Sequence, residues 1–155
     1  MSPRAAWRLE TLGFENVHDY VAGKADWMAH GLSVAGDVAD QPRVIDHVRD
    51  DVITCRLDDK IADVRQRVAE CRYGFAFVTT AEGVLLGRLR KAALEGPSDL
   101  TASEVMEPGP STTRPNTAPT ELLARLQKAD LTTAVLTDPE GRLLGIVRRS
   151  DLDST

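Results

Sequence analysis

The chain of 155 residues has little of what several common kinds of site require. It contains two cysteines and three histidines, and none has a cysteine or histidine partner at metal-ligand spacing. Neither a disulfide framework nor a zinc site is therefore predicted. No apolar run approaches the roughly 20 residues that cross a bilayer. The N-terminus also lacks the basic-then-apolar pattern of a signal peptide. We expect a reduced, cytoplasmic protein without a metal or cofactor.

Charge and motif content exclude further classes. The formal net charge is −5, so no general affinity for nucleic acid or an anionic membrane is expected. No Ser-His-Asp set, glycine-rich phosphate loop or pair of catalytic carboxylates is recognisable. The composition, 42% hydrophobic and 28% charged, is that of an ordinary globular protein. We therefore predict a folded protein that is not an enzyme.

The sequence does contain an internal repeat. The spacing from Gly83 to Gly141, which we call the repeat offset, recurs for many other residues without a gap. Agreement of this kind indicates a duplication and not a chance similarity of two hairpins. The matched pairs include Thr54 and Thr112, Arg56 and Arg114, Arg67 and Arg125, Ala76 and Ala134, Thr79 and Thr137, Leu86 and Leu144, Gly87 and Gly145, Arg90 and Arg148, and Leu94 and Leu152.

Each copy reads as a helix followed by a β-hairpin. Short runs of β-formers flank a glycine turn in both copies, since glycine adopts the positive φ that a tight turn needs. Apolar residues at helical spacing precede each hairpin. The predicted strands are 75–79 and 84–89 in copy one, and 133–137 and 142–147 in copy two. The predicted helix faces are Ile61, Val64, Val68 and Cys71, and then Leu122, Leu126 and Ala129.

Helix-start signals are duplicated as well. Thr101 to Glu104 has the form of a capping box, and Arg43 to Asp46 lies at the repeat offset from it. Thr117 is expected to cap the second long helix, and Pro119 suits its first turn because a missing N–H costs little there. Residues 95–98, Glu-Gly-Pro-Ser, break the helical pattern between the copies.

One copy is too small to bury its own apolar faces, whereas two packed copies can do so. We therefore predict an α/β (α+β) fold in which two βαββα repeats are related by a pseudo-twofold axis, with an N-terminal helix-strand extension. The predicted divisions are residues 1–40 for the extension, 41–97 for repeat one and 98–155 for repeat two.

The segments 102–106 (Ala-Ser-Glu-Val-Met), 141–147 (Gly-Arg-Leu-Leu-Gly-Ile-Val) and 148–152 (Arg-Arg-Ser-Asp-Leu) resemble the CBS (cystathionine-β-synthase) repeat family. The resemblance covers about Val44 to the C-terminus. It implies a disc-shaped module whose clefts hold adenosine-containing ligands such as AMP, ADP or ATP. It also implies a homodimer that senses energy status and regulates a protein partner.

Carried over position by position, the resemblance implies a ligand site in repeat two. Asp151 would accept hydrogen bonds from ribose hydroxyls, because a carboxylate offers only acceptors. Helix capping is the alternative role for Asp151. Thr112 and Thr113 would line the base and sugar. Backbone groups of Thr133 and Ala134 would contact an adenine edge.

The chain departs from the family pattern at the phosphate position. Arg148 replaces its small hydroxyl in repeat two, and Arg90 does so in repeat one, where Ala93 also replaces the aspartate. Repeat one has therefore lost its ribose acceptor. If the pseudo-twofold axis brings Arg90 and Arg148 together, they could clamp one anion. Alternatively, both are solvated surface charges.

Residues 1–40 lie outside the repeat. Residues 4–12 predict a helix ended by Gly13, 17–20 a short strand, and 26–30 a helical turn. Leu12 to Val17, with Gly23 and Trp27, resemble the last segment of a rhodanese domain, but the catalytic cysteine loop has no counterpart here. Residues 71–74 are only superficially similar to that loop, so Cys71 is expected to be a buried apolar residue. The expected anchors of this segment on the module or at a dimer interface are Trp7, Phe14, Tyr20 and Trp27.

Three functions follow from these observations. The leading one is a regulatory module that binds an adenosine nucleotide or related anion between the repeats and signals to a partner. The second is a ligand-free dimerisation or interaction scaffold. The third is a fragment of a rhodanese-linked sulfurtransferase.

Overall fold

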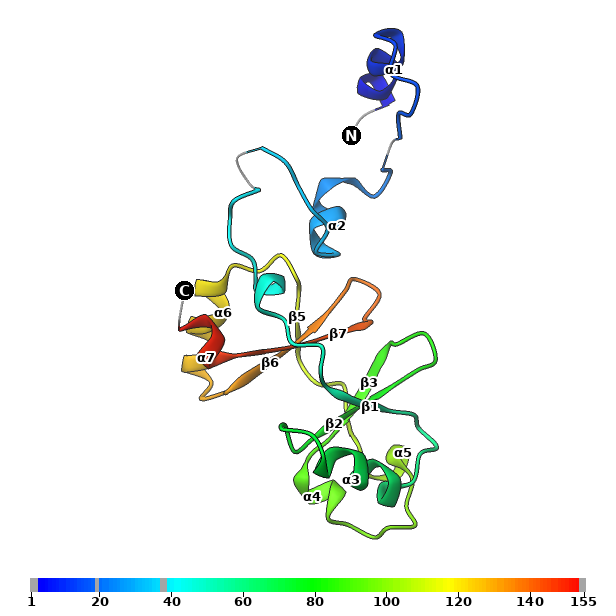
Figure 1. The fold of residues 1–155 in the computed structure, drawn as a ribbon, viewed down its shortest axis with the longest axis vertical. Helices are drawn as coiled ribbons and strands as arrows, with labels where there is room; N and C mark the ends of the chain where they lie inside the picture. Colours follow the sequence, from blue (N-terminus) through cyan, green and yellow to red (C-terminus); the bar gives the residue numbers. More distant parts are fainter. Residues whose placement is uncertain (1–2, 19, 37–38, 154–155) are drawn as a thin grey trace.

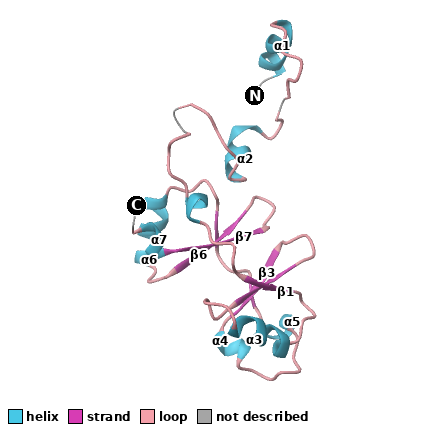
Figure 2. Ribbon diagram, in the orientation of Figure 1, coloured by secondary structure: helices cyan, strands magenta, loops and turns pink. Residues whose placement is uncertain are grey.

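The computed structural model describes residues 3–18, 20–36 and 39–153. Two small β-sheets lie next to each other in the middle of the molecule, and short helices cover their outer sides (Figures 1 and 2). The two N-terminal helices project from one end (Figure 1). Within the described residues, no helix is long and apolar enough to cross a membrane.

The first sheet has the strand order β1-β2-β3-β4. Its first two strands are parallel because helix α3 crosses over between them, while the tight turn after β2 makes β2 and β3 antiparallel. The elements are β1 (Ile53–Cys55), α3 (Ile61–Ala69), β2 (Ala76–Thr79), β3 (Leu85–Leu89), α4 (Lys91–Leu94), α5 (Ala102–Val105) and β4 (Glu107–Pro108).

The second sheet, β5-β6-β7, repeats this plan. Ala76 pairs with Leu89 in the first sheet, and their counterparts Ala134 and Val147 pair in the second. The predicted fold of two α/β repeats is therefore confirmed. The elements are the 3₁₀ helix η1 (Val44–His47), β5 (Thr112–Thr113), α6 (Pro119–Lys128), β6 (Thr133–Thr137), β7 (Leu143–Arg148) and α7 (Arg149–Leu152).

Matching side-chain contacts also appear in the two copies. The Nη1 of Arg56 donates to the hydroxyl of Thr79 over 3.1 Å, and the Nη1 of Arg114 donates to that of Thr137 over 3.2 Å. Both arginines come from the residue after the first strand, and both threonines end the second strand. These four residues are among those that the repeat offset matches, so the duplication extends from sequence to side-chain geometry.

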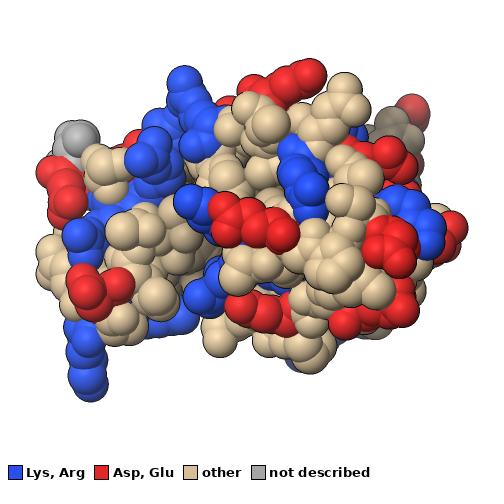
Figure 3. All heavy atoms as spheres, turned by 90° about the horizontal axis from the view of Figure 1, so that it is seen from below, with Lys and Arg blue, Asp and Glu red and all other residues tan. Residues whose placement is uncertain are grey.

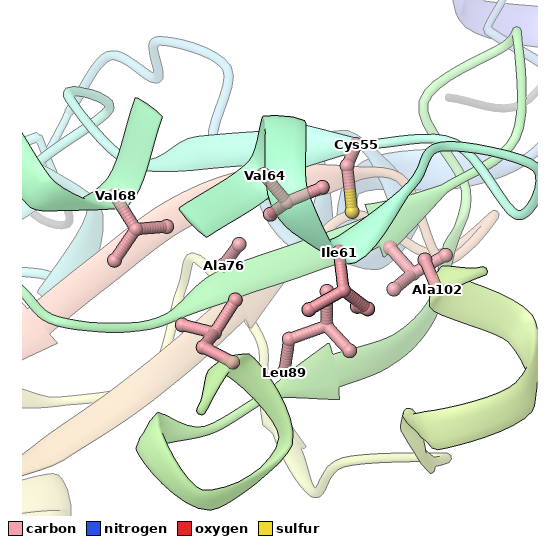
Figure 4. Packing of buried hydrophobic residues seen from close by; sticks show 9 residues of the cluster. Cys55, Ile61, Val64, Val68, Ala76, Leu89 and Ala102 are labelled. Atoms are coloured by element: carbon pink, nitrogen blue, oxygen red, sulfur yellow. The ribbon is translucent and has the colours of Figure 1, made fainter. Parts of the chain in front are cut away.

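The segment that leads into each copy packs on the other copy. We call residues 43–49 and 101–107 the two lead-in segments. Ala102 lies in the apolar cluster of repeat one (Figure 4), whereas Val44 lies in the cluster of repeat two with Leu122 and Leu136. β4 extends the first sheet beside β3, and Arg49 forms a bridge to Ile146 in the second. This exchange ties the repeats together.

Two matched glycines make room for the exchanged segments. A Cβ on Gly145 would lie 2.2 Å from the carbonyl oxygen of Arg49, and the φ of Gly145 is +140°. A Cβ on Gly87 would lie 2.9 Å from the carbonyl oxygen of Glu107. Only a residue without a side chain permits such close backbone approach. The two glycines are therefore required by the packing between copies.

Three apolar clusters hold the module together. One belongs to each repeat, and Figure 4 shows the first, with Ile61 and Val64 of α3 facing Ala76 and Leu89 of the sheet. The third joins the repeats through Phe77, Val135 and Ile146. Two backbone bonds between the hairpins complete the pseudo-twofold arrangement, from Leu85 N to Gly141 O at 2.9 Å and from Leu143 N to Gly83 O at 3.0 Å.

Local details agree with the sequence-based expectations or correct them. The capping boxes are present, with the backbone N–H of Thr101 donating to Glu104 and that of Arg43 to Asp46. Pro119 begins α6 as expected, but Ala118 and not Thr117 is its N-cap, without a side-chain bond. Cys71 and Ala129 lie beyond the ends of their helices, which are Ala69 and Lys128.

The N-terminal segment forms helices α1 (Pro3–Thr11) and α2 (Gly23–Ala29). The expected strand at 17–20 is wrong for the described residues, and Asp19 lies outside them. α2 meets repeat two, where the Nε2 of His30 is 2.9 Å from the Oε2 of Glu140. α1 lies apart, with Trp7 63% and Phe14 59% exposed, so these two do not anchor it.

Candidate functional site

An open cleft lies between the repeats. Its walls come from the end of β3 in repeat one and from the segments entering β5 and β6 in repeat two. Its volume is about 360 Å³. We call it the arginine cleft, and it is lined by Arg88, Arg90, Pro110, Ser111, Asp130, Leu131, Thr132, Thr133 and Val135.

Two arginines and one glutamate dominate its electrostatics. The Nη2 of Arg88 lies 3.2 Å from the Oε2 of Glu107, and the Nε of Arg90 lies 2.9 Å from the same oxygen. The Nε of Arg88 is buried and has no acceptor among the described residues. A buried donor without an acceptor costs roughly 1–3 kcal/mol. The arrangement therefore has more donor capacity than Glu107 satisfies.

Bulkier apolar residues stand at several of the matched positions in the other copy. At the repeat offset, Ile146 stands for Arg88, Phe75 for Thr133 and Tyr73 for Leu131. Ile146 is fully buried against Phe77 and Val135, with Phe75 and Tyr73 packed on them. The ring centroids of Tyr73 and Phe75 are 5.8 Å apart. We call this region the aromatic cluster, because its rings occupy the space that small residues leave open on the other side.

Asp151 lies beside the aromatic cluster and is already paired. Its two carboxylate oxygens accept from the Nε and Nη2 of Arg49 at 2.7 and 2.8 Å. These hydrogen bonds hold the pKa of Asp151 below its ordinary value and raise the pKa of Arg49. The hydroxyl of Tyr73 donates to Asp51 over 2.7 Å, and burial raises the pKa of Tyr73. The acceptor expected to contact ribose is thus occupied by an arginine of the lead-in segment.

The structure divides the seven predicted ligand residues between different places. Arg90 and Thr133 line the arginine cleft. Arg148 is exposed at the N-cap of α7, and Asp151 lies in that helix, held by Arg49. The three remaining residues lie on β5 and β6 without lining the cleft: Thr112 is exposed, whereas Thr113 and Ala134 are buried.

Several residues of the arginine cleft and of the Asp151 site were not singled out from the sequence, among them Arg88, Thr132, Glu107 and Arg49. A signal for two of them is present in the repeat itself, because Arg88 stands where the other copy has Ile146, and Glu107 stands where it has Arg49. Positions at which the matched copies differ in charge therefore supply Arg88 and Glu107 to the arginine cleft.

Charge is unevenly distributed on the face that Figure 3 shows. Lys and Arg side chains gather toward the left of this view and Asp and Glu side chains toward the right. A negative net charge thus coexists with a basic region on this face. Within the described residues, no group of three His, Cys, Asp or Glu side chains could hold a metal ion.

The two cysteines occupy different environments. Cys55 is buried on β1, and burial raises its thiol pKa to about 11, so it is protonated at neutral pH. Cys71 is only half-buried and lies in the turn that follows α3. Its Sγ is 3.8 Å from the carbonyl oxygen of Asp51.

Comparison with known proteins relates this arrangement to one fold. Residues 102–154 match the family model described as CBS domain. No curated protein sequence matches the chain. The CBS domains of a transcriptional regulator from Streptococcus pneumoniae superpose with a TM-score of 0.66 at 19% identity, covering 75% of this chain and 100% of that one. The fold is that of a CBS domain pair.

Two other structures with this fold are complexes with adenosine nucleotides. CBSX2 in complex with AMP has a TM-score of 0.63 at 17% identity, covering 72% of this chain and 93% of that one. The cytosolic domain of the Mg²⁺ channel MgtE in complex with ATP has a TM-score of 0.63 at 23% identity. The match covers 70% of this chain but only 46% of that one. None of the comparisons supports the resemblance of residues 1–40 to a rhodanese domain.

Proposed function

We propose that this CBS pair is a non-catalytic sensor that binds an adenosine nucleotide or related phosphate-bearing ligand in the arginine cleft and transmits the event to a protein partner. The observation that carries the proposal is the pair Arg88 and Arg90, which face small polar residues in a cleft that the other copy fills with aromatic rings. CBS structures of the same fold are complexes with AMP and with ATP.

The lining suits a phosphate group. Guanidinium groups recognise phosphate through fixed, planar donors. Ser111, Thr132 and Thr133 of repeat two also line the cleft, and a hydroxyl group can donate to or accept from a sugar or base. A volume of about 360 Å³ falls within the range of small-molecule sites. Ala93 leaves no ribose acceptor in repeat one, so phosphate contacts supply most of the recognition.

Ribose binding by Asp151 stays a separate hypothesis. A ligand there must displace Arg49 from a bidentate pair whose carboxylate is only 18% exposed. This favours the arginine cleft as the first site to be filled.

The regulatory part of the proposal rests on how the repeats are joined. The lead-in segments cross between copies, so a ligand that changes the angle between the sheets also moves both segments. A ligand shifts such an equilibrium only by its difference in affinity for the two states. A homodimer and an associated protein target belong to the proposal, as does the division of the chain at residues 40 and 97.

Isothermal titration calorimetry with ADP, AMP, ATP and S-adenosylmethionine tests the binding claim. We expect at least one of the nucleotides to bind the wild type. Arg88→Ala combined with Arg90→Ala should abolish that binding, whereas Asp151→Ala should leave it nearly unchanged. Arg67→Ala is a matched control, because Arg67 is a half-exposed arginine of α3 that pairs with Asp59 and does not line the cleft.

The same experiment decides between this function and a ligand-free scaffold. The aromatic cluster favours the scaffold for one side of the module, because its rings pack against Ile146 at the positions where the arginine cleft has Thr133 and Leu131. If none of the four compounds binds, the sensor proposal is wrong and the scaffold stands. Binding that survives Arg88→Ala/Arg90→Ala but is lost in Asp151→Ala would move the site to Asp151.

A further inference from the structure

We propose that Glu107 is an internal ligand of the arginine cleft, which an incoming phosphate group displaces from Arg88 and Arg90. This inference rests on the proposed function, since it describes how the same cleft is regulated. Glu107 would then couple ligand binding to the segment that joins the two repeats.

The geometry of the contact is that of an exchangeable pair. A single oxygen of Glu107 serves both arginines, at 3.2 Å from Arg88 and 2.9 Å from Arg90, and the Glu107 side chain is 52% exposed. The Nε of Arg88 remains buried without an acceptor in this arrangement. The three oxygens of a terminal phosphate offer more acceptors than one carboxylate oxygen. Turning Arg88 from Glu107 toward such a group removes the unsatisfied donor.

The matched position in the other copy shows the same device in a closed form. Arg49 corresponds to Glu107 by the repeat offset. Arg49 pairs with Asp151 in α7, the helix after β7. In the same way, Glu107 pairs with Arg90, which directly precedes α4, the helix after β3. The bond of Arg49 to Asp151, however, is bidentate and better shielded from water. Each lead-in segment thus supplies one charged residue that pairs with a residue of opposite charge in the other segment of the site: Arg49 with Asp151, and Glu107 with Arg88 and Arg90. Of these two contacts, only the one made by Glu107 is exposed enough to exchange.

Release of Glu107 affects a weakly held strand. β4 consists of Glu107 and Pro108, and its pairing with β3 involves only Gly87 and Arg88. One further backbone bond, from Gly109 N to Leu86 O at 3.0 Å, follows it. The strand connects α5, in the core of repeat one, to β5 of repeat two. A ligand that takes the arginines away from Glu107 therefore loosens the connection between the repeats.

The test measures the affinity of ADP and of inorganic pyrophosphate for wild type, Glu107→Gln and Glu95→Gln. Glu95→Gln is the matched control, because Glu95 makes only a 3.7 Å ion pair with Lys91 on the surface of α4. If Glu107 competes with the ligand, Glu107→Gln should bind both probes about fivefold more tightly, as expected from losing two half-exposed ion pairs. Glu95→Gln should bind like the wild type. Circular dichroism of each variant checks that it is folded.

The outcomes separate this inference from the proposed function. Tighter binding in Glu107→Gln alone supports displacement, including the case in which binding is detectable only in that variant. If the wild type binds ADP through Arg88 but Glu107→Gln binds equally or less tightly, Glu107 orients the arginines and the displacement idea is wrong. Absence of binding in both proteins overturns the inference together with the arginine-cleft site. Equal tightening in Glu95→Gln would reduce the effect to general charge and also overturn it.

Discussion

Replacing Arg88 with isoleucine should make the protein more stable and abolish ligand binding in the arginine cleft. The substitution gives repeat one the residue that repeat two has at the matched position, where Ile146 is fully buried in the apolar cluster between the repeats. Arg88 lies opposite Phe77 on the neighbouring strand, so an isoleucine there meets an apolar partner. The change therefore converts an open, charged cleft into a second packed interface.

The magnitude follows from three contributions. Removing the buried, unbonded Nε of Arg88 recovers roughly 1–3 kcal/mol. The additional apolar burial of isoleucine contributes about 1 kcal/mol. This is less than the value for burying a fully exposed isoleucine, because the aliphatic part of arginine already covers apolar surface. Losing the ion pair to the half-exposed Glu107 costs less than about 1 kcal/mol. We expect a net gain of about 2 kcal/mol, or roughly 4–8 °C in Tm for a chain of this size.

Urea unfolding followed by circular dichroism measures this difference. Arg88→Ala is the control for the shape of the side chain, since it removes the donor without filling the space and should gain less. Arg90→Ala should change stability little, because Arg90 is exposed. If Arg88→Ile is less stable than the wild type by more than about 1 kcal/mol, Arg88 stabilises the folded protein. The reasoning that the charged cleft lowers stability would then be wrong.

Two further predictions concern the exchanged lead-in segments. Gly145→Ala should destabilise the protein by about 3 kcal/mol or more in urea unfolding, because its Cβ would lie 2.2 Å from a backbone carbonyl at positive φ. Gly96→Ala, whose Cβ would approach nothing closer than 3.2 Å, should cost much less, and equal losses would contradict the close-approach argument. The second prediction follows from the lowered pKa of Asp151, which stabilises the folded state above the ordinary aspartate pKa, a contribution lost as pH falls through the folded pKa. Asp151→Asn should therefore be less stable than the wild type at pH 7, and the difference should shrink toward pH 3. A difference that is independent of pH would show that the Arg49 pair does not set it.

Differences between the copies carry the functional information in this molecule. The strands, helices and capping boxes are duplicated because both copies must form the same half of one module. The residues facing the space between the copies are free to differ, and they do so in pairs: Ile146 against Arg88, and Arg49 against Glu107. One side has become a packed interface and the other has kept an open, basic cleft. A single ligand per module is the stoichiometry that this asymmetry favours.

The elements were predictable because their signals are local. Helix α6 follows from Pro119 and the spacing of Leu122 and Leu126, and the hairpin turns follow from Gly83 and Gly141. The strand at 17–20 failed because a short run of β-formers without a partner strand has nothing to pair with. Asp151 lies in α7, and its pairing with Arg49 joins residues 102 positions apart. No local pattern encodes such a contact.

The sequence by itself determined that the chain contains one unit twice, since a constant, ungapped repeat offset requires both copies to form the same elements. It also determined which residue types each copy offers to a ligand. Only the tertiary structure decided how these residues are combined, because the lead-in segments cross between the copies. That crossing gives Asp151 its partner Arg49, and it gives Arg88 and Arg90 the shared carboxylate of Glu107. The arginine cleft stays open beside repeat one, the repeat that has no ribose acceptor.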